Sequence, residues 1–446
     1  MKRLLPFIIG IIVLLAFVVA IPLLLQPESH RSQLADLLSR QLGRKVVIGK
    51  LEAGIFPPMF KLHEVAVMDA TGSSPALQIE RLEAGTTLGA LIKFAFEPKS
   101  LTFYHWLLTI HRRANGSWDS DDWSAAVGKT AEGGGLSNVV SHQGECHWVD
   151  PFAPGSTELV LQGIEGSFDK DQMSATLAGN LTGLAATLGV HVDAKGHFLS
   201  DPDWSGDLRM TDSDRSWGLH LTGKKGLLMA DGLATQWRAD TVAGLIRFYT
   251  RWSQTVAASS TPALLQNWKS QFVCSGSSFT FQQEGALAGG RLKANGSAAS
   301  TGGQFQGQAS VTVENVPLPV LGDLAGFSSP ADGALSATAQ FSDVFSSDPW
   351  QSLSGDATVD VAQGRYRLPE SALHKLAKAH TFGYLKAKFP NVEQDGVPFS
   401  HIHLRGQAKD GVTTISNGLL DAGDVRAAVA GAFDGARRGV EGYVRL

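Results

Sequence analysis

Charged side chains are scarce in this chain of 446 residues. Asp, Glu, Lys and Arg together make up 18% of it, whereas an average soluble domain contains about 25%. The formal net charge at pH 7 is only -4. Proteins that bind nucleic acids usually present a basic face, so the charge balance gives no support to a nucleic-acid partner. Hydrophobic residues still make up 43% of the chain, which excludes a disordered protein.

Cysteine is nearly absent. The chain contains only Cys146 and Cys274, which lie far apart and form no C-x-x-C pair. In an oxidising compartment the two could form a disulfide. Two buried free thiols are an equally acceptable interpretation, and the sequence leaves both open.

The short motifs of the common enzyme classes are also missing. The chain contains no G-x-S-x-G, no H-E-x-x-H, no P-loop and no G-x-G-x-x-G before a helix, each of which places reactive or phosphate-binding groups at a fixed spacing. We therefore expect a protein that is not an enzyme and needs no cofactor. A hydrolase whose catalytic residues come from distant parts of the chain is the remaining alternative.

Three short patterns contain residue types that bind metal ions. They are His142, Cys146 and His147; His401 and His403; and Asp119, Asp121 and Asp122. The first pattern lacks a fourth ligand nearby, and the third lacks the Gly and Glu of an EF-hand loop. In the second pattern both imidazoles point to one face of a predicted strand, where a solvated outer face is the simpler interpretation. We expect no metal site at any of the three.

The N-terminal segment is an almost unbroken apolar run without charge, from Leu4 to Leu25. About 20 such residues cross the hydrocarbon core of a bilayer. Lys2 and Arg3 precede the run, which predicts a cytoplasmic N-terminus. We therefore expect residues 1–26 to anchor the chain once in the inner membrane, with the body in the periplasm. The alternative is a cleaved signal peptide ending near Ala20, and this also exports the body.

Short strands with glycine-containing turns dominate the body. Glycine occurs 49 times, and apolar and polar residues alternate with the period of two that is typical of half-buried strands. In the segment from residue 101 to 113 this alternation places Tyr104, Trp106, Leu108 and Ile110 on one face. The spacing of about 8–12 residues between strands favours one long antiparallel meander.

A few amphipathic helices interrupt the strands. The first is predicted from Ser29, which can cap it, to Leu42, and Gly43 ends it. A second is predicted from Thr241 to Gln254, with Phe248 and Trp252 on its apolar stripe and arginines opposite, which is typical of an interfacial helix or a lid. A third is predicted over residues 369–389.

Two segments resemble the AsmA-like family. The first contains Leu34, Leu37-Leu38, Leu42-Gly43-Arg44-Lys45-Val46-Val47-Ile48, Phe56-Pro57 and Val65-Ala66-Val67-Met68-Asp69 after the apolar run, and the second contains Gly364-Arg365-Tyr366, Val397-Pro398-Phe399, Gly411-Val412 and Gly431. Together the two segments cover about half of the chain. The chain is short for this family and lacks a further C-terminal helix.

The resemblance implies a long antiparallel sheet curled into a groove with an apolar inner surface, similar to bridge-like lipid-transfer proteins. It further implies a role in phospholipid transport between the inner and outer membranes, or in outer-membrane homeostasis. The partners would be phospholipid acyl chains, which need an apolar wall and no reactive side chain. The residues expected to contact lipid are Tyr104, Trp106, Leu108, Ile110, Phe248 and Trp252. A closed sandwich core is the structural alternative, and an outer-membrane assembly or scaffolding factor acting by protein contacts is the functional one.

The predicted organisation has four parts. They are the anchor, residues 1–26; an AsmA-like N-terminal region, residues 27–120; a central β-groove, residues 121–360, with a helical insertion at 241–270; and an AsmA-like C-terminal region, residues 361–446. A last strand, Gly439 to Arg445, leaves an edge to which a second copy or an outer-membrane protein could add. An edge left to water and blunted by Glu441 and Arg445 is the alternative.

Overall fold

The computed structural model describes most of the chain from Pro27 to Arg445. The described ranges exclude residues 94, 114–117, 120–135, 152–156, 185, 199–202, 214, 251–262, 277, 302–303, 326–328, 330, 343–351, 368–382, 384–385, 411, 424 and 435–438. Within them, no helix is both long enough and apolar enough to cross a membrane. The predicted anchor, residues 1–26, and most of the helix predicted at 369–389 lie outside the described residues.

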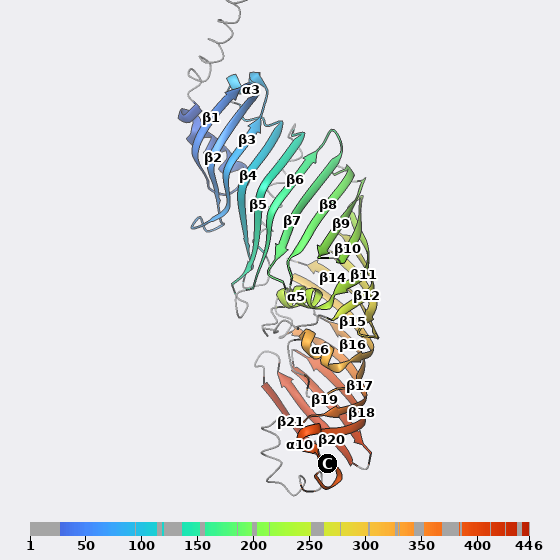
Figure 1. The fold of residues 1–446 in the computed structure, drawn as a ribbon. Helices are drawn as coiled ribbons and strands as arrows, with labels where there is room; N and C mark the ends of the chain where they lie inside the picture. Colours follow the sequence, from blue (N-terminus) through green and yellow to red (C-terminus); the bar gives the residue numbers. More distant parts are fainter. Residues whose placement is uncertain are drawn as a thin grey trace, which may run out of the picture. The chain divides into compact units, whose positions relative to one another are not determined.

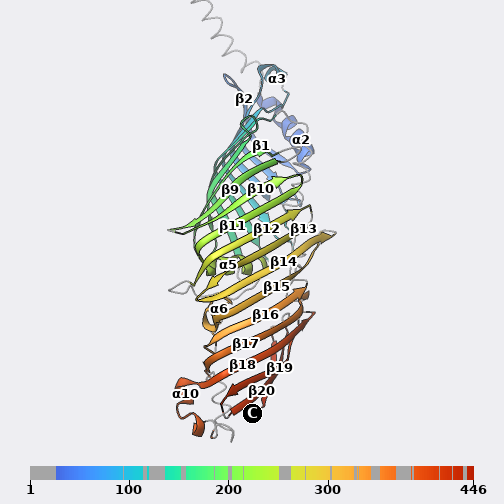
Figure 2. The same cartoon turned by 90° about the vertical axis from the view of Figure 1, so that its right-hand side faces the viewer.

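The prediction of a mainly β fold with a few helices is confirmed. The chain divides into two compact units, the first containing residues up to Met210 and the second beginning at Thr211, apart from two short segments. Each unit is an open sheet in which successive strands of the chain are neighbours (Figures 1 and 2).

The first unit contains η1 (Pro27–His30), α2 (Arg31–Leu42), β1 (Val46–Ile55), β2 (Pro58–Met68), β3 (Pro75–Gly85), α3 (Leu88–Ile92), β4 (Ser100–His111), β5 (Asn138–Asp150), β6 (Thr157–Asp169), β7 (Ser174–Thr182), β8 (Leu188–His197) and β9 (Asp203–Asp212). Its strands pair antiparallel from β1 to β4 and from β5 to β8. The pair β4–β5 is parallel, so the expectation of an entirely antiparallel sheet is wrong at this point. A parallel pair needs a crossover connection, which here runs between His111 and Asn138.

Helix α2 confirms the amphipathic helix predicted after the anchor. Gly43 adopts the left-handed conformation, with φ 64°, and its N–H donates to the Ser39 carbonyl, as expected for a glycine that ends a helix. The predicted start of this helix is wrong. Ser29 belongs to η1, and α2 begins two residues later without a side-chain cap. Leu34, Leu38 and Leu42 pack on the buried core formed by β1, β2, β3 and α3.

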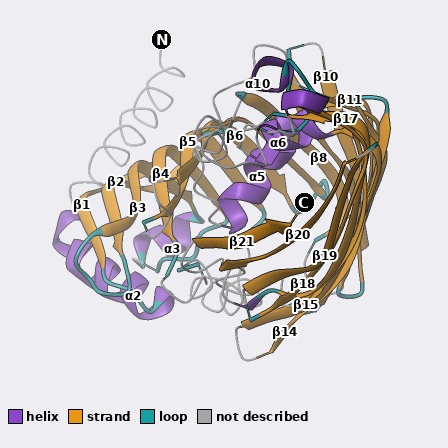
Figure 3. Ribbon diagram, turned by 90° about the horizontal axis from the view of Figure 1, so that it is seen from below, coloured by secondary structure: helices purple, strands orange, loops and turns teal. Residues whose placement is uncertain are grey.

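The second unit contains β10 (Arg215–Lys224), β11 (Leu227–Arg238), α5 (Ala239–Thr250), β12 (Leu264–Ser275), β13 (Ser278–Leu287), β14 (Gly290–Thr301), β15 (Gln304–Pro317), α6 (Leu318–Ala325), β16 (Ala334–Ser342), β17 (Ser354–Tyr366), α10 (Val392–Asp395), β18 (Val397–Lys409), β19 (Val412–Ala422), β20 (Val425–Asp434) and β21 (Gly439–Arg445). Each strand from β11 to β21 pairs antiparallel with the one before it. Helix α5 confirms the helix predicted near residue 241. The strands of this unit curve, and α5 and α6 lie on the inner side of the curve (Figure 3).

A row of left-handed residues crosses the first sheet and reverses the alternation of its side chains. Glu64 in β2, His105 in β4 and Gln143 in β5 have φ values of 52°, 49° and 51°. Before Glu64 the buried residues of β2 are Phe60 and Leu62; after it they are Val65 and Val67, although the pairing of β2 with β1 stays in register. An uninterrupted strand would place Leu62 and Val65 on opposite faces. The alternation expected for the strands of the body is therefore wrong in β2, because it reverses at Glu64.

Glycine is required where this row begins. A Cβ added to Gly49 of β1 would lie 2.5 Å from the Glu64 carboxylate and 2.8 Å from its Cβ. The side chain of Glu64 thus occupies the space beside Gly49, and any larger residue at position 49 would displace the Glu64 side chain.

Candidate functional site

The lipid-contacting residues predicted in β4 do not all share one face. Trp106, Leu108 and Ile110 pack in one apolar cluster with Cys146 and Ile164. Tyr104 faces the other way, because the left-handed residue His105 lies between it and Trp106. The prediction that Tyr104 belongs to the same face is wrong.

Tyr104 belongs to a polar face of the first unit. The Arg81 guanidinium, from β3, lies 3.9 Å from the centre of the Tyr104 ring. The His142 ring, from β5, stacks with the Tyr104 ring, and the two centroids are 5.1 Å apart. His142 pairs with Glu165 at 2.9 Å. Hydrogen bonds from His142 and from the Gln143 N–H lower the pKa of Glu165. This face is a solvated network of opposite charges.

Trp106 lies in a closely packed position. Its ring N–H donates to the Ser141 hydroxyl at 2.8 Å, and a Cβ added to Gly144 would lie 2.1 Å from the ring. Phe248 lies in α5, but its side chain is outside the described part of the structure, as is all of Trp252. The two predictions made for α5 therefore stay predictions.

A larger apolar face lies in the second unit and was not among the residues predicted to contact lipid. Register pairs connect positions of neighbouring strands into rows across the sheet, and two of these rows contain long uninterrupted runs of apolar residues. In the first row the run consists of Phe272, Phe281, Gly296, Ala309, Phe341, Gly355 and Ala408, and in the second of Ala294, Val311, Ala339, Ala357, Gly406, Ile415 and Gly431. The runs end at polar residues, Thr413 beside Ala408 and Gln283 beside Ala294.

These apolar residues are not covered as a closed core would be. All seven members of the second run are only half-buried, and so are all members of the first run except Ala408. Residues toward the α6 end of the same face, such as Val316, Val361 and Phe399, are buried. The face is therefore closed along one margin and partly open over the strands. A hollow of about 700 Å³ is lined by Phe281 and Phe341 but mostly by polar residues that alternate with the apolar ones along the strands, such as Gln282, Asn295 and Gln340, so it does not by itself mark the apolar face.

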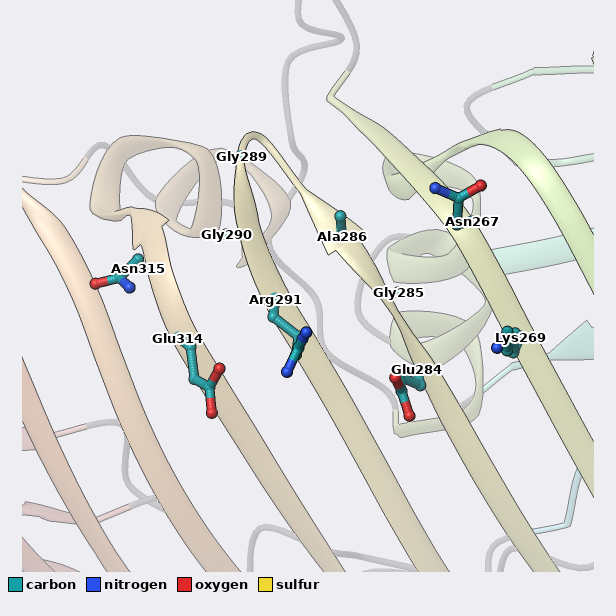
Figure 4. Close-up of a pocket in the computed structure, with 10 residues that line it drawn as sticks. All are labelled: Asn267, Lys269, Glu284, Gly285, Ala286, Gly289, Gly290, Arg291, Glu314 and Asn315. Atoms are coloured by element: carbon teal, nitrogen blue, oxygen red, sulfur yellow. The ribbon is translucent and has the colours of Figure 1, made fainter.

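The opposite face of the same strands is mainly polar, although the exposed Val273 and Leu419 also lie on it. One row consists of Gln271, Gln282, Asn295, Ser310, Gln340, Asp356, Gln407 and Thr414. A hollow of about 510 Å³ on strands β12–β15 is lined by Lys269, Glu284, Arg291 and Glu314, among other residues, and these side chains are drawn in Figure 4. Two positive and two negative side chains stand there, and all four are exposed. This hollow is a solvated surface of balanced charge.

The pattern of His142, Cys146 and His147 is not assembled into a common site. Cys146 lies in the apolar cluster, where burial raises the pKa of its thiol to about 12, so it stays protonated and unreactive. His147 instead contacts Glu158 at 2.6 Å. Asp119 accepts a hydrogen bond from the His111 N–H at 3.0 Å, and its predicted partners lie outside the described residues. Cys146 and Cys274 are both free thiols.

The pattern of His401 and His403 gains a residue that sequence reasoning missed. Asp360 of β17 lies opposite His403 of β18 in the register. Its carboxylate contacts both imidazoles of the pattern, at 2.7 Å for His403 and 3.0 Å for His401. Only the pairing of the two strands could identify Asp360, since it lies 43 residues from His403 in the chain.

Comparisons with known proteins add no relative. No protein-family model matches the chain, and no curated protein matches it. The resemblance to the AsmA-like family therefore remains an interpretation of the two sequence segments.

Proposed function

We propose that this chain is a periplasmic lipid-handling protein whose apolar sheet face receives the acyl chains of phospholipids. The observation that supports this most is the half-buried apolar face of β12–β20. Large contiguous apolar surfaces left open in a folded protein commonly mark binding sites. The two apolar runs contain no charged or hydrogen-bonding side chain, which fits a ligand that is itself an unbranched hydrocarbon.

The dimensions of the face agree with this ligand. The row from Ala294 to Gly431 crosses seven strands. At about 4.8 Å per strand this is roughly 29 Å. A single acyl chain spans about half of the hydrocarbon core of a bilayer, or about 15 Å. One row therefore offers enough length for an acyl chain, and the small side chains of Ala and Gly leave room above the sheet.

Transport between the inner and outer membranes, or a contribution to outer-membrane homeostasis, is the role we propose for this binding. Transport needs a site that holds the acyl chains without trapping them. An open apolar surface has that property, because apolar contacts do not depend on direction. The anchor over residues 1–26 would keep the face close to its source of lipid. An assembly or scaffolding factor that acts by protein contacts is the competing function.

Photocrosslinking in living cells tests the proposal. A photoreactive amino acid is placed at Val311 or Val359 on the apolar face, and at the neighbouring Thr312 or Thr358 as matched controls, which face the other side. We expect phospholipid adducts at the two valine positions and none at the two threonine positions. Protein adducts without lipid at the valine positions would favour the scaffolding function, and equal lipid labelling on both faces would contradict the proposed site.

A further inference from the structure

Three metal-binding side chains converge on the polar face of the second unit. Asp360 in β17 pairs with His403 in β18, and the neighbouring pair is Ala362 with His401. His401 and His403 are two residues apart, so both project to the face that Asp360 occupies. Their rings stack nearly parallel, with centroids 6.3 Å apart and an interplanar angle of 11°.

A single oxygen lies between the two imidazoles. Asp360 Oδ1 is 2.7 Å from His403 Nδ1 and 3.0 Å from His401 Nε2. One donor atom from each of the three residues lies within 4.8 Å of the other two. The two strands therefore present two nitrogens and one carboxylate oxygen toward a common point.

This arrangement is close to the geometry of a zinc site. Zinc bonds to nitrogen and carboxylate oxygen are about 2.0–2.2 Å long and tetrahedral, so ligand atoms lie about 3.3 Å apart. To admit the ion, Asp360 Oδ1 would have to move about 0.6 Å away from His403 Nδ1 and about 0.3 Å away from His401 Nε2. The two imidazole nitrogens, which lie within 4.8 Å of one another, would have to take up the same spacing of about 3.3 Å. Side-chain rotation supplies such a shift, because His401 and Asp360 are 46% and 39% exposed.

We propose that Asp360, His401 and His403 bind a zinc ion, with water in the fourth position. Imidazole nitrogens favour zinc and similar divalent ions over magnesium and calcium. Bound zinc would join β17 to β18 by bonds between side chains, on the face opposite Ile402 and Leu404. The ion therefore does not lie on the proposed lipid surface, and this inference is independent of the proposed function.

A metal titration of the full chain tests the site. The protein is purified in detergent with a tag that contains no histidine, stripped with a chelator, and titrated with Zn²⁺ by calorimetry. We expect saturable binding of one ion per chain. His401→Ala and His403→Ala should each weaken it at least about 100-fold, since substitution of a residue that only hydrogen-bonds to a zinc ligand already weakens metal binding by about 10–100-fold.

Two further variants separate the site from general histidine binding. Asp360→Asn keeps the size of the side chain but removes its charge, so it should fold normally and weaken zinc binding. His142→Ala removes a histidine that contacts a single carboxylate in the first unit and should leave zinc binding unchanged.

A measurement on the unaltered protein makes the test independent of variant folding. Co²⁺ added in place of zinc should produce the visible absorption bands of a four-coordinate site, and Zn²⁺ should abolish them. Absence of saturable Zn²⁺ binding, absence of these bands, or equal zinc affinity in His142→Ala and His403→Ala would overturn the proposal.

Discussion

Val311 and Thr312 are successive residues of β15 that face opposite sides of an open sheet. Val311 lies between Ala294 and Ala339 in the apolar row, and Thr312 lies between Lys293 and Thr338 in a polar row. Both residues are half-buried, so neither is protected by a second layer of structure. This pair therefore separates the effect of the ligand from the effect of the fold.

Val311→Glu should abolish lipid binding while the protein still folds. A carboxylate against hydrocarbon costs about 2.5 kcal/mol or more, which corresponds to roughly 70-fold weaker binding. In the lipid-free protein the same carboxylate reaches water at the edge of its half-buried position. Mass spectrometry of co-purified lipid measures the loss, and circular dichroism measures the fold.

Thr312→Glu is the matched control for this prediction, because it adds the same charge one residue away on the polar face. It should leave the lipid content unchanged. If Val311→Glu unfolds the protein and Thr312→Glu does not, the apolar face is a closed core instead of a lipid surface. Unchanged lipid content in Val311→Glu would remove this row from the proposed site.

At the scale of single elements, the left-handed residues of β2, β4 and β5 determine which side chains share a face. His105 has φ 49°, a conformation that costs an L-residue about 1–2 kcal/mol. The strands on either side of it remain paired in register. Packing holds this reversal in β4. Phe103, before His105, and Trp106 and Leu108, after it, all pack against the apolar clusters of the first unit.

At position 105 the usual stability ranking of glycine and valine in strands should be reversed. His105→Gly removes the strain and should leave the free energy of unfolding unchanged or raise it by about 1 kcal/mol. His105→Val should lower it by about 1–2 kcal/mol, because a β-branched residue resists this conformation most. In an ordinary strand position valine is the more stabilising of the two. Chemical denaturation of both variants measures the order, and the ordinary ranking would contradict the assigned conformation.

The same elements show how much the sequence could predict. Alternation in β14–β18 follows directly from apolar residues at every second position, and helix α2 follows from its leucine stripe and Gly43. The reversal at His105 could not be predicted, since nothing local distinguishes a left-handed histidine from an extended one. The parallel pairing of β4 with β5 could not be predicted either, because it depends on the long connection between His111 and Asn138. Asp360 joins His401 and His403 only through strand register, which one strand alone does not determine.

At the scale of the whole molecule, lipid handling depends on where the body lies relative to a membrane. Acyl chains exchange slowly through water because their apolar surface must be exposed. A protein that takes them from a bilayer is most effective when it is held beside that bilayer. We propose the apolar segment of residues 1–26 for this task, because its length matches the hydrocarbon core of a bilayer.

The orientation of this segment is the final prediction. Lys2 and Arg3 are the only charges before the apolar run, and positive residues are retained on the cytoplasmic side. A reporter enzyme that is active only in the periplasm, fused after Leu446, should therefore be active, and the fusion should sediment with the inner membrane. Replacing Lys2 and Arg3 by glutamate should reduce that activity while a fusion to a cytoplasmic reporter gains it. Full activity of a cytoplasmic reporter on the unaltered chain would exclude the periplasmic location, and with it a direct role in lipid transport between the two membranes.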